Sequence, residues 1–226
     1  MTELQDFIMS PEDYDPKWPY YLELMTRQLS AKRLEHSLKV AETGVALSRI
    51  YGGDPVKIAL AGLLHDSAKE MKDRQLLAIA EEQGLITDPA EQENPSILHG
   101  PVAAWMAETQ WGVKDPIVLE SIRYHTTAAP HMSIEACIVF LADLIEPGRS
   151  YQGIAELRAL ALIDLKVAML ESIDQTFIFL DRKKVPVHQG MVACRQWLAE
   201  TEFEYQTNHP EANKNVSTLK GDPHEQ

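Results

Sequence analysis

The chain has 226 residues, of which 45% are apolar and 24% are charged, and its formal net charge at pH 7 is -13. This balance indicates a globular protein: the apolar runs are too short to cross a bilayer, and the acidic start lacks the basic and apolar parts of a signal peptide. The excess of acidic groups argues against sequence-independent nucleic-acid binding, so we expect a cytoplasmic protein with no nucleic-acid or membrane partner.

Helices are predicted from "YYLELMTRQLS" onward. Segment 31–51 repeats apolar residues at helical spacing and ends at "GGD". Asp54 and Pro55 then form a start signal for the helix that carries His65 and Asp66. Start and stop signals predict further helices at about 73–83, 99–110, 115–125, 133–145, 153–181 and 189–204.

The fold class predicted from these elements is all-α. No segment alternates polar and apolar residues, and no Asn-Gly or Asp-Gly hairpin signal occurs. We expect residues 1–20 to be an N-terminal extension and 21–205 to be one helical domain. The polar stretch 206–226, which holds His209 and His224, is expected to be a disordered tail.

The two cysteines, Cys137 and Cys194, lie far apart in different apolar contexts. Their spacing is not that of a thiolate metal site or a disulfide framework. We therefore expect two buried, free thiols.

Two apolar helices deliver ionisable groups that are costly to bury. His65 and Asp66 follow "IALAGLL", and Asp143 stands inside "ACIVFLADLIEP". Burial of such groups needs compensation, and a metal ion is the simplest compensation when several of them converge. For Asp143 alone, a buried cap of another helix is an equal alternative.

Three more histidines occupy predicted helices or their ends. His36 lies within an amphipathic helix, His99 opens a helix and His125 ends one, whereas His131 is expected at the surface. His36 taken alone is a surface or core residue, but the four histidines and the two aspartates together form a possible metal site in a bundle core. Imidazole and carboxylate ligands suit Mn, Fe, Co, Ni or Zn, and the lack of thiolates disfavours a structural zinc site.

The order of these residues resembles the H…HD…H…H…D pattern of HD-domain phosphohydrolases. The segments "RLEHSLKVAETGVALSRIYGGD", "AGLLHDSAKEM", "LHGPVAA", "IRYHTTAAPHMS" and "FLADLIEPGR" are similar to the bacterial YqeK-type family of symmetrical diadenosine tetraphosphate hydrolases. The resemblance implies an HD-domain helical bundle with additional C-terminal helices. Two departures are Ala128, where a glycine often follows the two threonines, and Gly100, where alanine is usual.

The resemblance implies one or two divalent metal ions. His36, His65, Asp66 and Asp143 would bind one ion, and Asp66, His99 and His125 the other, with Asp66 as a bridge. A water activated by the metal would be the nucleophile, so no Ser or Cys nucleophile is needed. Iron is the expected metal, and Mn, Co or Zn suit the same ligands.

Phosphate recognition requires donors around this centre. We expect Arg33 and Lys69 to act in catalysis with Asp66. The alternative for Arg33 is a surface ion pair with Glu35 or Glu42. The alternative for Lys69 is a solvated position. The expected substrate contacts are Arg33, Thr126, Thr127, Arg149, Lys184 and His188, the last two from a loop at 183–188. For the threonines, helix-end capping is the alternative.

The implied reaction is hydrolysis of diadenosine tetraphosphate into two ADP, and a homodimer is expected by analogy. One alternative is an HD phosphohydrolase acting on a deoxynucleotide, a guanosine alarmone or a cyclic dinucleotide. Another is a non-catalytic, nucleotide-sensing HD module.

Overall fold

The computed structural model describes residues 9–200, in which helices and turns are the only regular elements. The all-α prediction is therefore confirmed. The elements are η2 (Pro11–Asp13), α1 (Trp18–Gln28), α2 (Ala31–Tyr51), α3 (Pro55–Leu64), α4 (Asp73–Glu82), α5 (Pro89–Glu93), η3 (Pro95–Leu98), α6 (His99–Thr109), α7 (Pro116–Tyr124), α8 (Ile134–Ile145), α9 (Ile154–Ala161), α10 (Leu165–Lys183) and α11 (Gln189–Glu200).

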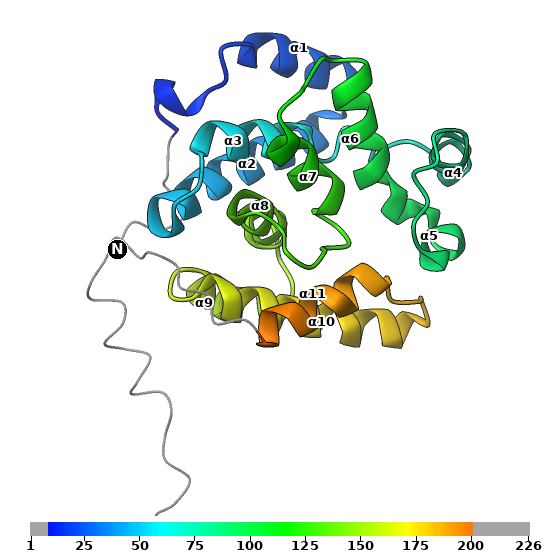
Figure 1. Cartoon of the computed structure of the whole chain (residues 1–226). Coiled ribbons are helices and arrows are strands. Elements are labelled where there is room, and N and C mark those ends of the chain that lie inside the picture. The colour runs from blue at the N-terminus through cyan, green and yellow to red at the C-terminus, as the bar shows by residue number, and fades with distance from the viewer. Residues whose placement is uncertain (1–8, 201–226) are drawn as a thin grey trace, which may run out of the picture.

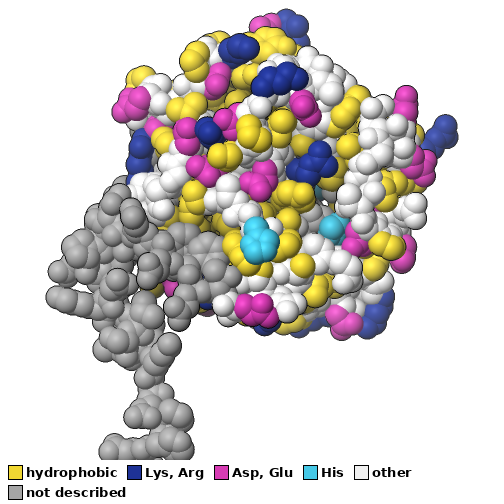
Figure 2. All heavy atoms as spheres, viewed as in Figure 1, with side chains coloured by type: hydrophobic (Ala, Val, Ile, Leu, Met, Phe, Trp, Pro, Cys, Tyr) yellow, Lys and Arg dark blue, Asp and Glu magenta, His cyan; other side chains and the backbone are white. Residues whose placement is uncertain are grey.

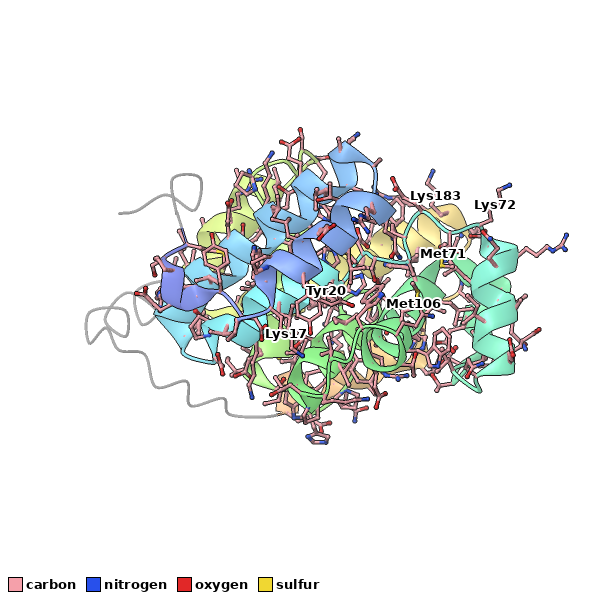
Figure 3. All side chains as sticks on the ribbon, turned by 90° about the horizontal axis from the view of Figure 1, so that it is seen from above. Lys17, Tyr20, Met71, Lys72, Met106 and Lys183 are labelled. Atoms are coloured by element: carbon pink, nitrogen blue, oxygen red, sulfur yellow. The ribbon has the colours of Figure 1, made fainter. Side chains whose placement is uncertain are left out.

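Helices α2, α3, α6, α7 and α8 form the body of the molecule, and α9 to α11 lie along its lower side (Figure 1). Helices α4 and α5 lie to one side of this body. Figure 3, in which Lys17 and Tyr20 mark α1, shows this helix over α2 and α3, which it contacts. None of the described helices is both long and apolar enough to cross a membrane. On the face in Figure 2, acidic and basic side chains are interspersed.

Helix α3 is deeply packed where it leads to the site. The Asp54 carboxylate accepts hydrogen bonds from the backbone N–H groups of Val56 and Lys57, which caps the helix before Pro55. Every residue from Ile58 to Leu64 is buried. A side chain at Gly62 would place its Cβ 2.7 Å from Ala41 Cα, so only glycine permits this approach of α3 to α2. The packing fixes the end of α3 next to the middle of α2.

Helix α8 supplies the opposite wall. Ser133 caps it by accepting a hydrogen bond from Ala136 N, and its apolar residues from Ala136 to Ala142 are all buried. The helix ends at Ile145, two residues before Pro147, because a proline disfavours helical backbone in the residue that precedes it. The thiols of Cys137 and Cys194 are free and buried, as expected.

Most predicted helices agree with the structure to within one or two residues, but the single helix expected at 153–181 is wrong. Helix α9 ends at Ala161, and α10 begins only at Leu165. The Asp164 carboxylate accepts a hydrogen bond from Val167 N, so this residue caps a new helix instead of continuing the old one. Helix α1 begins at Trp18, inside the expected extension, and the expected tail at 206–226 lies outside the described residues. The domain boundaries stay predictions.

Candidate metal centre

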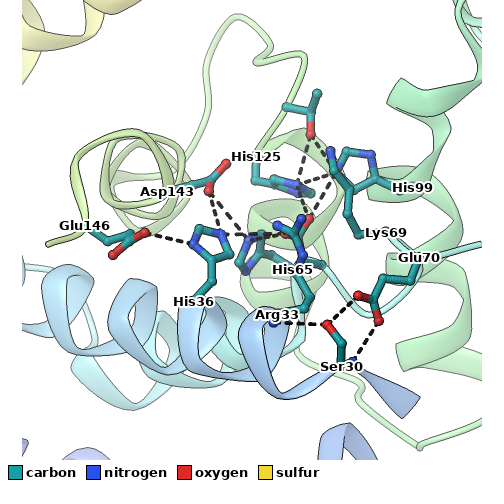
Figure 4. A network of polar contacts seen from close by, with 12 residues as sticks. Ser30, Arg33, His36, His65, Lys69, Glu70, His99, His125, Asp143 and Glu146 are labelled. Carbon is teal, nitrogen blue, oxygen red and sulfur yellow. Dashed lines mark hydrogen bonds and ion pairs between the residues drawn. The ribbon is translucent and has the colours of Figure 1, made fainter. Parts of the chain in front are cut away.

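Four histidine side chains converge from four different helices or helix ends (Figure 4). His36 comes from the second turn of α2, and His65 and His125 directly follow α3 and α7. His99 is the first residue of α6. His65, His99 and His125 are buried, and the His36 side chain is 10% exposed. The structure therefore brings together all four histidines that the sequence singled out.

Three of these imidazoles are oriented by backbone carbonyls. The Nδ1 atoms of His65, His99 and His125 lie 2.7, 2.6 and 2.7 Å from the carbonyl oxygens three residues earlier in the chain. Because a carbonyl can only accept, each Nδ1 carries the hydrogen, and in the neutral ring Nε2 is left with a lone pair. All three lone pairs are thereby directed into the cluster.

His36 is oriented differently. Its Nδ1 lies 3.1 Å from Glu146 Oε1, and its Nε2 lies 3.0 Å from Asp143 Oδ1. Glu146 follows α8 directly and its side chain is 4% exposed. Glu146 is not among the residues predicted from the sequence, although an acidic residue three positions after Asp143 in "DLIEPGR" was a visible signal.

Asp66 lies between the two halves of the cluster. Its Oδ2 is 3.4 Å from His65 Nε2 and 3.6 Å from His36 Nε2, while its Oδ1 is 3.3 Å from His99 Nε2 and 3.7 Å from His125 Nε2. The two oxygens thus face different pairs of imidazoles. A carboxylate in this position can bridge two cations.

Neighbouring side chains keep both carboxylates ionised. Burial alone would raise the pKa of Asp66, but interactions with His65, His125 and His99 lower it well below its usual value. Asp143 behaves alike, because contacts with His36, His65 and Arg149 outweigh its burial and lower its pKa. Two anionic ligands are therefore available at neutral pH.

The histidines differ from one another in their protonation. Burial lowers the pKa of His125 to about 4 and also lowers that of His99. For His36, burial lowers the pKa, yet hydrogen bonds with Asp143 and Glu146 outweigh it and raise the pKa. Neutral His99 and His125 are in the form that binds metal.

The donor set fits a divalent cation. Two groups each offer ligand atoms within 4.8 Å of one another, the first made of His36, His65 and Asp143 and the second of His65, Asp66 and His125. His65 Nε2 is buried and has no hydrogen-bond partner within the described chain. A buried lone pair without a partner costs free energy, which a metal ion would remove.

Three cationic side chains surround the cluster. Arg33 Nη1 lies 2.6 Å from Asp66 Oδ2, and Arg149 pairs with Asp143. Lys69 Nζ lies 3.3 Å from His99 Nε2. Burial, together with the charges of Arg33 and Arg149, lowers the pKa of Lys69 despite Asp66 and Asp143.

Arg33 and Thr126 contact the cluster rather than the alternative partners expected for them, an ion pair at the surface and a helix end. Glu35, the alternative partner of Arg33, pairs instead with Lys39 at 2.6 Å. Thr126 Oγ1 lies 2.9 Å from His125 Nε2 and 3.1 Å from His99 Nε2, so it faces the cluster.

The start of α2 is tied to the segment after α3. Glu70 accepts hydrogen bonds from Ser30 N at 2.8 Å and Ser30 Oγ at 2.6 Å (Figure 4). Ser30 Oγ in turn accepts one from Arg33 N at 3.3 Å. This connection fixes Arg33 relative to the turn that carries Asp66.

A pocket of about 390 Å³, including its open mouth, adjoins the cluster. Its wall includes Asn94, Ile97, Thr126, Thr127, Leu180 and His188. Thr126 also contacts the histidines, so the pocket and the cluster share one wall.

The two loop residues expected to contact substrate lie in different surroundings. His188 lies in the pocket wall, where its Nδ1 accepts a hydrogen bond from Gly190 N at 2.9 Å and its Nε2 lies 3.5 Å from Glu91 Oε1. The Lys184 side chain is 81% exposed and pairs with Asp181 at 3.2 Å, and it is not part of the pocket wall. The structure therefore brings His188, but not Lys184, to the pocket.

The backbone explains Gly100 but not Ala128. Ala128 is fully buried with a φ of 50°, a conformation that glycine adopts more readily. A Cβ at Gly100 would lie 2.7 Å from the carbonyl oxygen of Arg123, so α6 approaches α7 closely beside His99. His131 is exposed, as expected.

Comparison with known proteins identifies the family. Residues 33–148 match the HD domain. The chain is 34% identical over 179 residues to "Bis(5'-nucleosyl)-tetraphosphatase, symmetrical" of Bacillus subtilis, covering 78% of this chain and 95% of that protein. It is 37% identical over 173 residues to the protein of the same name from Staphylococcus aureus, covering 76% and 89%.

A solved structure agrees with these matches. It is a Clostridium acetobutylicum protein described as a "predicted HD superfamily hydrolase involved in NAD metabolism", with a TM-score of 0.79 and 34% identity. The match covers 82% of this chain and 98% of that one. The chain therefore belongs to the HD-domain family, and within it to the family of the symmetrical bis(5'-nucleosyl)-tetraphosphatases, which it matches along most of their length.

Proposed function

We propose that this protein is a metal-dependent hydrolase that cleaves diadenosine tetraphosphate symmetrically into two ADP. The observation that carries the proposal is the buried cluster of four imidazole Nε2 atoms and two carboxylates, surrounded by three cationic side chains. The similarity to enzymes named for this symmetrical activity supports the choice of substrate.

The ligands proposed for one cation are His36, His65, Asp66 and Asp143, and those for a second are Asp66, His99 and His125. A bound divalent cation would lower the pKa of a coordinated water and stabilise charge on the phosphate oxygens. Asp66 serves both positions, because its two oxygens face different pairs of histidines.

The cationic side chains neutralise the polyphosphate. Arg33 and Arg149 each contact a carboxylate of the cluster, so both guanidinium groups can reach phosphate oxygens held there. Lys69, beside His99, is placed to stabilise the charge that develops on the leaving phosphate. Arg33, Lys69 and Asp66 are thus the side chains to which we assign catalytic roles.

The pocket beside Thr126 is proposed to hold one adenosine of the substrate. Thr126, Thr127 and His188 supply polar groups to its wall, next to apolar Ile97 and Leu180. If the adenosine of one ADP half occupies the pocket, the second phosphate of that half would lie at the cluster. Lys184 remains a proposed contact to the outer part of the substrate.

The reaction adds one water across a phosphoanhydride bond. The water oxygen bonds to a phosphorus next to the central bridging oxygen, that bridge breaks, and the departing ADP takes the bridging oxygen. One diadenosine tetraphosphate and one water therefore give two ADP.

Product analysis tests the proposal. Purified protein with Fe(II), Mn(II) or Co(II) is expected to convert diadenosine tetraphosphate into ADP alone, and a chelator should stop the reaction. Equal amounts of AMP and ATP would exclude the symmetrical reaction. Turnover of dGTP, a guanosine alarmone or a cyclic dinucleotide would reveal an HD phosphohydrolase of other specificity. If neither these nucleotides nor diadenosine tetraphosphate were hydrolysed, a nucleotide-sensing module would be favoured.

Asp66→Asn tests the centre itself. The variant keeps the size of the side chain but loses its charge, so we expect loss of both bound metal and activity. Asp174→Asn is the control, because Asp174 forms a half-exposed ion pair with Arg195. Normal metal content in Asp66→Asn would contradict the bridging role.

Iron is the metal that we propose for the cell, and Mn, Co and Zn suit the same imidazole and carboxylate ligands. Metal analysis of protein purified without oxygen tests this choice. We also propose that the protein is cytoplasmic and forms a homodimer. The exposed Ile178 and Phe179 on α10 offer apolar surface for a second copy, and light scattering in solution measures the oligomeric state.

A further inference from the structure

The four histidines of the cluster differ in the group that faces their Nδ1 atoms. Backbone carbonyls accept the Nδ1 hydrogens of His65, His99 and His125, whereas a carboxylate faces Nδ1 of His36. A charged acceptor forms the stronger hydrogen bond with an imidazole. It also raises the basicity of the opposite ring nitrogen, here Nε2, which faces Asp143.

The Glu146 carboxylate is enclosed by its own turn. Its side chain is 4% exposed, and it accepts a hydrogen bond from Gly148 N. A Cβ at position 148 would lie 2.9 Å from Glu146 Oε2, so the backbone at Gly148 packs closely against the carboxylate. A buried carboxylate is costly unless it is paired, and Glu146 Oε1 faces His36 Nδ1 at 3.1 Å and, more distantly, Arg149 Nε at 3.9 Å.

The side chain of Arg158 also holds this turn in place. The Arg158 guanidinium donates to the carbonyl oxygens of Ile145 at 2.8 Å, Glu146 at 2.7 Å and Arg149 at 3.1 Å. These three carbonyls lie at or after the end of α8, where helical partners are lacking. The turn that presents Glu146 is therefore held by side-chain contacts at three points.

We propose that Glu146 is a positioning residue for the metal centre, acting through His36. Its carboxylate holds the hydrogen on Nδ1, turns the Nε2 lone pair toward Asp143 and His65, and makes His36 the strongest imidazole donor of the four. The inference rests on the proposed metal centre but not on the substrate.

Manganese binding without substrate tests the role. Glu146→Gln keeps the size of the side chain but offers only a neutral acceptor. The dissociation constant for Mn²⁺, measured by equilibrium dialysis and electron paramagnetic resonance, is expected to rise about 10- to 100-fold. Glu135→Gln is the matched control, since Glu135 is a buried carboxylate on α8 that accepts a hydrogen bond from Asp54 N at 2.9 Å, and its Mn²⁺ affinity should stay at the wild-type value.

A double-mutant cycle separates positioning from a general effect on the turn. In a His36→Gln background, Glu146→Gln should have no further effect on Mn²⁺ affinity, because its action passes through the absent imidazole. Far-ultraviolet circular dichroism of all the variants should match wild type.

Two results would overturn the inference. Wild-type Mn²⁺ affinity in Glu146→Gln would show that the carboxylate does not support the ligand. An equal loss of affinity in the His36→Gln background would assign the effect to the turn. Tight Mn²⁺ binding by wild type without ADP formation would instead remove the proposed function and leave this inference standing.

Discussion

The Nε2 atoms of His99 and His125 lie 2.9 Å apart, although both rings carry their hydrogen on Nδ1, where each donates to a backbone carbonyl. Two lone pairs therefore face each other inside the protein. The Thr126 hydroxyl, 3.1 and 2.9 Å away, has one hydrogen and can satisfy only one of them. A cation between the two rings would satisfy both.

Removal of metal is expected to destabilise the protein. A ligand present at 100 times its dissociation constant stabilises the folded state by about 2.7 kcal/mol. For a chain of this size, that corresponds to a fall in Tm of about 5–10 °C after chelation. Differential scanning calorimetry of Mn²⁺-loaded and chelator-treated protein measures the difference, and identical transitions would argue against a metal centre.

Arg33→Ala is expected to lower kcat/KM for diadenosine tetraphosphate by about 100-fold, because the phosphate charge of the transition state would lose a cationic hydrogen-bond donor. Arg33→Lys should recover only part of this, because lysine lacks the forked geometry. Arg27→Ala is the control, since Arg27 makes an exposed pair with Glu23 on α1. Steady-state kinetics checks the effect, and wild-type kcat/KM in Arg33→Ala would exclude a phosphate contact.

The stability of the metal-free protein should fall as the pH decreases from about 6.5 to about 4. Burial lowers the pKa of His125 from 6.5 to about 4, so in this range the unfolded chain binds the proton and the folded chain does not. Stability consequently rises with pH across the window, and this single shift corresponds to about 3 kcal/mol. The lowered pKa of His99 acts in the same direction, while the stability that the raised pKa of His36 contributes is lost only as the pH rises above about 6.5, outside this window.

Urea denaturation of metal-free protein at pH 7, 5.5 and 4.5 measures this dependence. His125→Gln removes the titrating group and should show a shallower dependence on pH than wild type. The same slope in both proteins would mean that His125 is not held neutral in the folded state.

Gly62→Ala is expected to destabilise the protein by about 1–3 kcal/mol, because its Cβ would meet the Ala41 backbone and force α2 and α3 apart. The displacement would also separate His36 from His65, so Mn²⁺ affinity should fall together with Tm. Gly84→Ala serves as a comparison, because a Cβ at position 84 meets no atom within 4 Å. Its loss of stability should come only from the positive φ of 63° at that position. If Gly62→Ala kept wild-type Mn²⁺ affinity, the close helix packing would not position the ligands.

Leu180→Trp tests the pocket. The larger side chain should fill part of it and raise the KM for diadenosine tetraphosphate, while Mn²⁺ affinity stays at the wild-type value. Val167→Trp is the control, because Val167 is 42% exposed on the same helix and is not part of the pocket wall. An unchanged KM in Leu180→Trp would place the adenosine elsewhere.

The amino-acid sequence by itself determined most of the helices and the set of candidate ligands. Capping at Asp54 and Ser133 and the apolar runs that follow them are local signals, and local hydrogen bonds are enough to set where such helices begin. The order of His36, His65, Asp66, His99, His125 and Asp143 then indicated the family, which the comparisons confirmed.

Only the tertiary structure decided which groups contact each other. Glu146 lies behind His36 across 110 positions of sequence, and Arg33 pairs with Asp66 rather than with its neighbour Glu35. Such contacts arise when whole helices pack, as at Gly62, and no local pattern specifies them. The break between α9 and α10 differs from these contacts, because the Asp164 cap is a local signal: its carboxylate accepts a hydrogen bond from Val167 N three residues later.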